Sequence, residues 1–107
     1  MKIKRIDEEV IEFDNGNYIT YDHPQDCCEW NYADFSQLDD IARDYDFEEN
    51  LRFEPLEEKG FRFGDSRQMF FVPCYSEQNG YYTGELDIYY RGKEVAHIDD
   101  CDYSRGY

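Results

Sequence analysis

The sequence predicts an α+β protein: a twisted antiparallel sheet of five to seven strands, with one helix over about residues 34–45 packed on it. Short runs of alternating apolar and polar residues dominate the chain, as is typical of half-buried strands. Asn-Gly, the strongest short hairpin signal, occurs at Asn15-Gly16 and at Asn79-Gly80. A single segment has apolar residues at helical spacing, which predicts the helix.

The first 22 residues predict an antiparallel meander. Its predicted strands are residues 3–6, 9–13 and 18–21. Asn15 and Gly16 both tolerate positive φ, so this pair predicts the turn between the second and third strands. Pro24 then ends the alternation, and His23 to Asn31 is interpreted as a polar loop.

The helix prediction depends on a cap and on spacing. Asp34 is placed to cap the helix, with Gln37 three residues later in the capping-box position. The apolar residues that fall on one helical face are Phe35, Leu38, Ile41 and Ala42. We expect this face to pack on the sheet, because the acidic residues fall elsewhere on the helix.

The remainder of the chain predicts further strands. They are residues 51–53, 61–63, 68–75, 81–90 and 95–98. The predicted turns are Lys59-Gly60, Asn79-Gly80 and Arg91-Gly92-Lys93. Pro73 lacks a backbone donor and therefore indicates a sheet edge or a bulge. In the 81–90 strand we expect one face to be made of Leu86, Ile88 and Tyr90, and residues 99–107 predict a loose polar tail.

The charge balance is the main functional signal. The chain has 26 acidic and 11 basic residues, a formal net charge of −15, yet 40% of it is hydrophobic and 19% aromatic. That apolar content predicts one folded domain over residues 1–107 rather than a disordered acidic tail. The charge argues against direct binding to nucleic acid or to an anionic membrane. It favours a basic protein partner; the alternative is a charge that only keeps the protein in solution.

The N-terminus turns acidic before any apolar run develops, so the sequence predicts no signal peptide. No stretch approaches the roughly 20 apolar residues that span a bilayer. We therefore expect the protein in the cytoplasm of a host cell. Its cysteines, which are Cys27, Cys28, Cys74 and Cys101, are expected to be reduced there.

Histidine and cysteine recur at one spacing, His-x3-Cys, at His23 to Cys27 and at His97 to Cys101. These residues, with Cys28 or Cys74 as substitutes, would supply a tetrahedral zinc site if the segments met in space. The usual Cys-x2-Cys knuckle is absent. The alternative is that the cysteines are free thiols and the histidines incidental, and the sequence predicts no cofactor.

The same residues are poor candidates for cysteine catalysis. A reactive thiolate needs positive neighbours, whereas Asp26 and Glu29 flank the Cys27-Cys28 pair and would raise its pKa. The glycines stand at predicted turns and form no phosphate-binding loop. The sequence therefore predicts a protein that is not an enzyme and has no catalytic residue.

The acidic residues are densest between Asp34 and Glu58, where ten acids accompany only Arg43 and Arg52. DNA carries one negative charge per ~1.7 Å of its axis, so carboxylates along a helix and loop can compete for a DNA-binding cleft. The candidate partner-binding residues are Asp39, Asp40, Asp44, Asp46, Glu48 and Glu49, with Tyr45 as an aromatic anchor. The alternative is a merely solvated helix face.

Two motifs carry a family resemblance: the segment His23-Pro24-Gln25-Asp26-Cys27-Cys28-Glu29 and the later Asn79-Gly80-Tyr81-Tyr82. With the acidic helix between them, they resemble a family of small uncharacterised proteins of bacteriophages and other mobile elements. Members share a His-x2-Asp-Cys-Cys-Glu motif and a late Asn-Gly-Tyr-Tyr motif. The resemblance covers most of residues 3–90 and transfers no catalytic role.

The resemblance implies a setting in which small acidic proteins act against host defences, as anti-CRISPR and anti-restriction inhibitors that mimic nucleic acid do. We therefore expect an inhibitor that binds a basic nucleic-acid-binding surface of a host defence nuclease, either CRISPR or restriction. One alternative is a zinc- or thiol-dependent binding module centred on His23, Cys27, Cys28 and Cys101. Another is a phage accessory protein whose charge only keeps it in solution.

Overall fold

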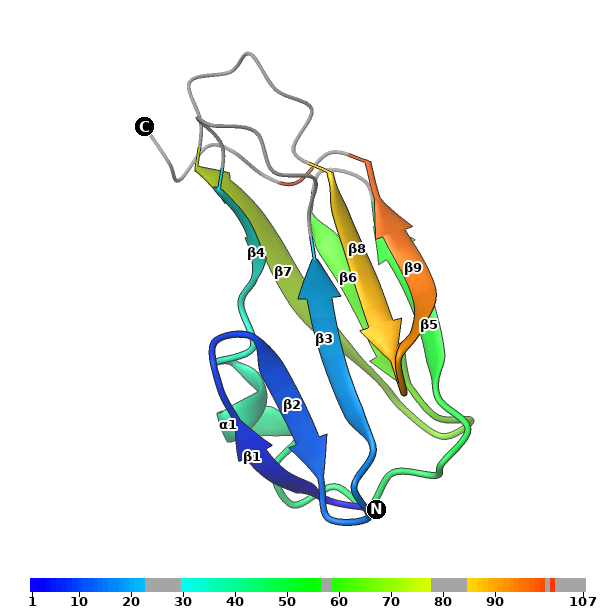
Figure 1. Cartoon of the computed structure of the whole chain (residues 1–107). Coiled ribbons are helices and arrows are strands. Elements are labelled where there is room, and N and C mark those ends of the chain that lie inside the picture. The colour runs from blue at the N-terminus through cyan, green and yellow to red at the C-terminus, as the bar shows by residue number, and fades with distance from the viewer. Residues whose placement is uncertain (23–29, 57–58, 78–84, 100, 102–107) are drawn as a thin grey trace.

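The computed structural model describes residues 1–22, 30–56, 59–77, 85–99 and 101 (Figure 1). In these residues the chain forms strands and one short helix. The elements are β1 (Ile3–Ile6), β2 (Val10–Phe13), β3 (Tyr18–Asp22), β4 (Trp30–Ala33), α1 (Leu38–Ile41), β5 (Arg52–Leu56), β6 (Gly60–Gly64), β7 (Met69–Glu77), β8 (Leu86–Tyr90) and β9 (Lys93–Ile98).

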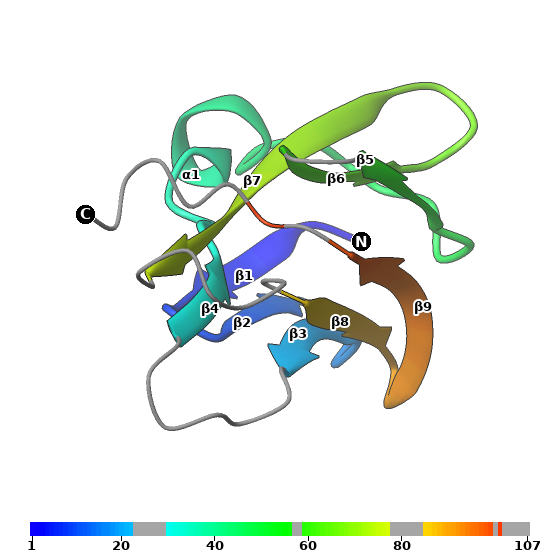
Figure 2. The ribbon, with the colours of Figure 1, turned by 90° about the horizontal axis from the view of Figure 1, so that it is seen from above.

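The strands form two antiparallel sheets, so the prediction of a single sheet of five to seven strands is wrong. One sheet has the order β1-β2-β3-β8-β9 and the other has the order β4-β7-β6-β5. The two sheets form two layers (Figure 2), and β5 contacts β9 along one side. Two facing sheets bury an apolar face of each, whereas a single open sheet would leave one such face in water.

The N-terminal meander is confirmed, since β1, β2 and β3 pair in sequence. In the turn between β2 and β3, Gly16 has a φ of +91° and its N–H donates to the Phe13 carbonyl (3.0 Å). The Asn15 side chain accepts a hydrogen bond from the Asn17 N–H (3.0 Å). The turn therefore lies where the sequence predicts it, although only Gly16 of the pair has a positive φ, which glycine adopts without steric cost.

The turn between β8 and β9 is also confirmed. Arg91 and Gly92 have φ values of 57° and 80°, the two positive values that a type I′ hairpin turn requires. Leu86, Ile88 and Tyr90 of β8 are buried, as their alternation predicts. The turn predicted at Asn79-Gly80 and the residues 81–84 of the predicted long strand lie outside the described residues.

One strand lies where a loop was predicted. β4 begins at Trp30, so the polar loop predicted over His23 to Asn31 is wrong for its last two residues. Asn31 is fully buried, its side-chain N–H₂ donates to the Glu85 carbonyl (2.9 Å), and its side-chain oxygen accepts from the Ser76 hydroxyl. A polar residue such as asparagine indicates a loop in the sequence, yet it can belong to a buried strand when its side-chain hydrogen bonds are made. Residues 23–29 lie outside the described residues.

The helix is much shorter than the predicted 34–45, since α1 contains only Leu38–Ile41. Asp34 does not cap it: the Asp34 Oδ1 atom accepts from the Ser36 N–H (3.0 Å) and from the Ser36 hydroxyl (2.6 Å). Gln37 is the residue before the helix, and no side chain caps the helix. Asp34 thus closes a local turn that ends before the helix begins at Leu38.

The predicted apolar face of this segment is mostly confirmed. Phe35, Leu38 and Ala42 are buried in the core. Ile41 is 56% exposed, so its assignment to the buried face is wrong. The helix ends at Ile41, so helical geometry does not hold Ile41 and Ala42 on one face.

Pro73 lies within β7, an inner strand, so the prediction of a sheet edge is wrong. The strand pairs with β6 up to Pro73 and with β4 from Cys74 onward. The missing N–H of proline therefore falls where the pairing passes from one neighbour to the other.

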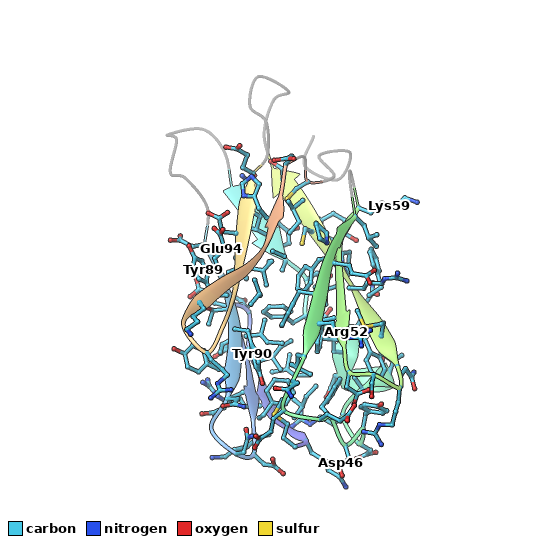
Figure 3. The ribbon with its side chains drawn as sticks, turned by 90° about the vertical axis from the view of Figure 1, so that its right-hand side faces the viewer. Asp46, Arg52, Lys59, Tyr89, Tyr90 and Glu94 are labelled. Atoms are coloured by element: carbon cyan, nitrogen blue, oxygen red, sulfur yellow. The ribbon has the colours of Figure 1, made fainter. Side chains whose placement is uncertain are left out.

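The space between the sheets is filled by aromatic rings. Phe47 packs against the rings of Phe13 (5.6 Å), Tyr45 (4.6 Å), Phe63 (5.6 Å) and Phe70 (5.4 Å), as measured between centroids. Figure 3 shows Tyr90 directed into this core, while Tyr89 and Glu94 lie on the outer side of β8 and β9. Such edge and stacked ring pairs add to the stabilisation that burial gives.

The C-terminal segment was predicted to be a loose tail. Cys101 is only 1% exposed and belongs to the core, so that prediction is wrong for this residue. Residues 100 and 102–107 lie outside the described residues. Within the described part of the chain, no helix is long and apolar enough to cross a membrane.

Candidate functional site

A cleft of about 510 Å³ opens between the two sheets, beside β3 and β4. The turn between β1 and β2 lines one part of it, and the segment between β4 and α1 lines another. Its lining residues are Ile6, Asp7, Glu8, Glu9, Tyr21, Tyr32, Ala33, Asp34, Phe35 and Ser36. The cleft is therefore built from segments that are separate in the sequence, and it combines carboxylates with aromatic rings.

The turn between β1 and β2 presents the acidic side of the cleft. The Asp7 N–H donates to the Val10 carbonyl (2.8 Å), and the Asp7 side chain accepts from the Glu8 N–H (2.7 Å). Arg5 pairs with Asp7 (2.9 Å). Glu8 and Glu9 are exposed and have no ion pair within the described residues. Among the described residues, Arg5 is therefore engaged by Asp7 and Glu12, and these two carboxylates are left without an ion pair at the cleft.

Aromatic side chains from both sheets line the rest of the cleft. Tyr21 of β3 packs edge-on against Phe35, with 5.9 Å between ring centroids, and its hydroxyl donates to the Glu8 carbonyl (3.1 Å). Tyr32 of β4 packs against Tyr75 (5.8 Å). Tyr21 and Tyr32 are half-buried, so part of each side chain is accessible while the rest is packed.

The pKa of Tyr21 reflects the electrostatics of this cleft. Burial and the nearby carboxylates of Glu9 and Glu8 raise the pKa of Tyr21 to about 12. Both burial and these carboxylates disfavour the negatively charged form of the tyrosine hydroxyl. The same negative potential attracts a cation, so the cleft is suited to a positively charged ligand.

The predicted partner-binding acids are all exposed, as a contact surface requires. Several of them have partners within the chain. Asp39 pairs with Arg43 (3.0 Å), Asp46 with the amino group of Met1 (2.9 Å), and Glu48 accepts from the Ser66 N–H (3.1 Å).

The predicted acids therefore fall into two groups, those with partners within the chain and those without. The Met1 amino group lowers the pKa of Asp46, and the Ser66 hydrogen bonds lower the pKa of Glu48. Within the described residues, Asp40 and Asp44 have neither an ion pair nor a side-chain hydrogen bond, so they are the acids of this segment with the most freedom to meet a partner.

Tyr45 is not an exposed anchor. It is half-buried, its hydroxyl donates to Asp65 (2.9 Å), and its ring packs on Phe47 and Phe70. The aromatic residue that the sequence places beside the acids therefore belongs to the core.

Sequence reasoning missed the buried acid that holds this segment. Asp65 is 2% exposed, and its carboxylate accepts from the Tyr45 hydroxyl, the Glu48 N–H (3.1 Å), and the N–H groups of Arg67 (2.9 Å) and Gln68 (3.2 Å). The Arg67 guanidinium lies 3.0 Å from it. These donors hold the pKa of Asp65 well below its usual range, although burial acts in the opposite direction. Asp65 is therefore structural.

His97 and the carboxylates around it form the second charged cluster. Its Nδ1 lies 2.5 Å from Asp87, and its Nε2 lies 2.9 Å from Asp99 and 3.7 Å from Glu85. The Asp87 hydrogen bond, more than the other charges, raises the pKa of His97. Ligand atoms of Glu85, His97 and Asp99 lie within 4.8 Å of one another, so they could hold a cation; a protonated His97 satisfies the same carboxylates.

The zinc prediction paired His97 with Cys101. The structure places His97 among carboxylates, whereas Cys101 is a free thiol buried in the core, as is Cys74. Burial raises the pKa of Cys74 well above its usual value, which is typical of an unreactive structural thiol. The other candidates, His23, Cys27 and Cys28, lie outside the described residues.

The sequence did contain one unused signal for the cleft. Asp7 and Glu8 lie between two predicted strands and Glu9 begins the second of them, so three consecutive acids were expected at or beside one turn. The aromatic side of the cleft could not be found in this way, because Tyr21 and Phe35 come together only through the packing of the two sheets.

Comparison with known proteins gives a family and no function. The family model of a domain of unknown function, DUF7448, matches residues 1–88. No curated protein and no solved structure matches the chain. The matched residues include every described residue that lines the cleft, whereas His97 and Asp99 lie beyond them. Because the match covers most of the sequence, the chain belongs to the DUF7448 family.

Proposed function

We propose that this protein is a non-enzymatic binding protein that recognises a basic, nucleic-acid-binding surface of a partner protein. The partner class we propose is a host defence nuclease of the CRISPR or restriction type, which the protein would inhibit by occupying that surface. The observation that carries the proposal is the exposure of the predicted acids together in one segment. They are Asp39, Asp40, Asp44, Asp46, Glu48 and Glu49.

The physical basis is charge complementarity. A net charge of −15 exceeds the magnitude of about 2–8 that keeps a small domain in solution. Carboxylates at an exposed surface attract a basic cleft and raise the rate of encounter, with an effect that salt screens. The Asp65 network supports such a role, because it fixes the backbone that carries Glu48.

The experiment compares two variants with the same change in net charge. Asp40→Asn/Asp44→Asn removes two acids from the proposed surface, and Glu94→Lys changes the charge equally on the outer side of β9. Nucleases that bind the immobilised wild-type protein at low salt are identified first. The inhibition of their DNA cleavage by the wild type and by each variant is then measured. We expect the double variant to inhibit about fivefold less well than the wild type, on the scale of two weakened exposed ion pairs.

The control variant, Glu94→Lys, should inhibit DNA cleavage within about twofold of the wild type. Equal losses in both variants would mean that only net charge matters, which contradicts a located surface. Absence of nuclease binding by the folded wild-type protein would contradict the proposed function itself.

A further inference from the structure

The cleft beside β3 and β4 plays no part in the proposed contact by residues 39–49. Its volume of about 510 Å³ lies within the range of roughly 300–1,000 Å³ that ligand sites occupy. None of its described lining residues is a lysine or an arginine, while Glu8 and Glu9 lack basic partners within the described chain. Arg5 lies beside these acids in the adjoining pocket and pairs with Asp7 and Glu12, so the described residues leave Glu8 and Glu9 available to a cation.

The lining sets two requirements on an occupant. It must carry positive charge, because an anion would be repelled and a neutral apolar group would remove water from Glu8 and Glu9 without replacing it. It must also have a flat or apolar part, because the lining includes the half-buried aromatic residues Tyr21 and Tyr32.

The arginine side chain meets both requirements. Its guanidinium stacks on aromatic rings and donates two parallel hydrogen bonds to a carboxylate, and its methylene stem packs on apolar surface. Lysine provides the charge and the stem, but not the planar fork.

We infer that the cleft between the β1–β2 turn and the β4–α1 segment binds an arginine side chain projecting from the basic partner, and a lysine side chain more weakly. This inference rests on the proposed function and adds an anchoring point to it. Glu8 and Glu9 would hold the guanidinium, and Tyr21 would provide the ring beside it. The acids of residues 39–49 would then contact other basic groups of the same partner.

The probe is an N-acetylated, C-amidated peptide of alternating arginine and glycine, whose affinity is measured by titration calorimetry. Peptides with lysine or with neutral citrulline in place of arginine serve as comparisons. We expect the arginine peptide to bind most tightly and the citrulline peptide about tenfold more weakly, since citrulline keeps the shape and loses the charge.

Two variants with equal changes in net charge locate the site. Glu8→Gln/Glu9→Gln neutralises the cleft, whereas Glu94→Lys lies on β9, at the opposite edge of the five-stranded sheet. We expect about a fivefold loss of affinity in the first and less than a twofold change in the second. Tyr21→Leu keeps an apolar side chain and removes the ring, and it should weaken binding about threefold if the variant retains the wild-type circular dichroism spectrum.

Backbone amide shifts in the NMR spectrum complete the test. Shifts of Tyr21, Ala33 and Ser36 on addition of the arginine peptide would support the site. The inference fails if Glu8→Gln/Glu9→Gln binds as the wild type does, or if the citrulline peptide binds equally well. If the cleft variant keeps its affinity while Asp40→Asn/Asp44→Asn loses nuclease inhibition, the cleft is excluded and the proposed function stands.

Discussion

Replacing Asp65 with asparagine should lower the free energy of unfolding by about 3 kcal/mol. The magnitude follows from the two carboxylate oxygens. Oδ1 accepts from the Tyr45 hydroxyl and from the N–H groups of Arg67 and Gln68, so an amide oxygen in that position keeps these bonds. Oδ2 accepts from the Glu48 N–H and the Arg67 guanidinium, and the amide N–H₂ of asparagine would face these donors.

Hydrogen bonds to a charged group contribute about 1.5–3 kcal/mol each. Loss of the two hydrogen bonds at Oδ2 would cost about 3–6 kcal/mol. We take the lower end, because the Arg67 side chain is largely exposed and can hydrogen-bond to water instead. Domains of this kind are stable by only about 5–15 kcal/mol, so the variant should be visibly weakened.

Urea unfolding followed by circular dichroism measures the difference. The control is Asp40→Asn, an exposed site where the change should stay within about 0.5 kcal/mol. The pKa of Asp65 is lowered in the folded state, so its stabilisation is present above the unfolded-state value and is lost as the pH falls toward the folded-state value. The two proteins should therefore converge in strong acid. A loss below about 1 kcal/mol at neutral pH would refute the assignment of Asp65 as the acid that holds residues 45–48.

Three further predictions test the core, the chain geometry and the charge cluster. Phe47→Ala should cost about 3–5 kcal/mol in urea unfolding, because its ring is buried among other aromatic rings; a loss near 1 kcal/mol would contradict that packing. Gly60→Ala should cost about 2–3 kcal/mol, because a Cβ there would lie 2.1 Å from the Val72 carbonyl oxygen and the φ of +147° is unfavourable; unchanged stability would contradict this geometry. His97→Gln should destabilise the protein at acid pH and have little effect at alkaline pH, since the raised pKa of His97 gives stability that is lost as the pH rises through its folded-state value. Equal effects at both pH values would contradict the ion pair with Asp87.

Local signals in the sequence predicted local structure well. The meander of β1 to β3 depends on alternation and on Gly16, and the β8–β9 turn depends on Arg91 and Gly92, which lie next to each other in the chain. The predicted start of the helix was wrong for an equally local reason. Asp34 has two competing uses, as a helix cap or as a turn with Ser36, and the sequence pattern does not rank their free energies.

Non-local structure could not be predicted in this way. Division into two sheets depends on which strands pair across long separations, such as β3 with β8. The cleft has the same origin, since Tyr21 and Phe35 meet only after the sheets pack. Tyr45 shows the converse error: a tyrosine next to exposed acids was interpreted as a surface anchor, while its partner Asp65 lies twenty residues further along the chain.

The central claim is that a located acidic surface binds a basic partner, and the salt dependence of that binding tests it most directly. The dissociation constant of a captured nuclease should be measured from about 50 mM to about 500 mM salt for the wild type, Asp40→Asn/Asp44→Asn and Glu94→Lys. We predict a steep loss of affinity with salt for the wild type and Glu94→Lys, and a shallower one for the double variant. A dissociation constant that does not change with salt, or equal slopes in all three proteins, would contradict the claim.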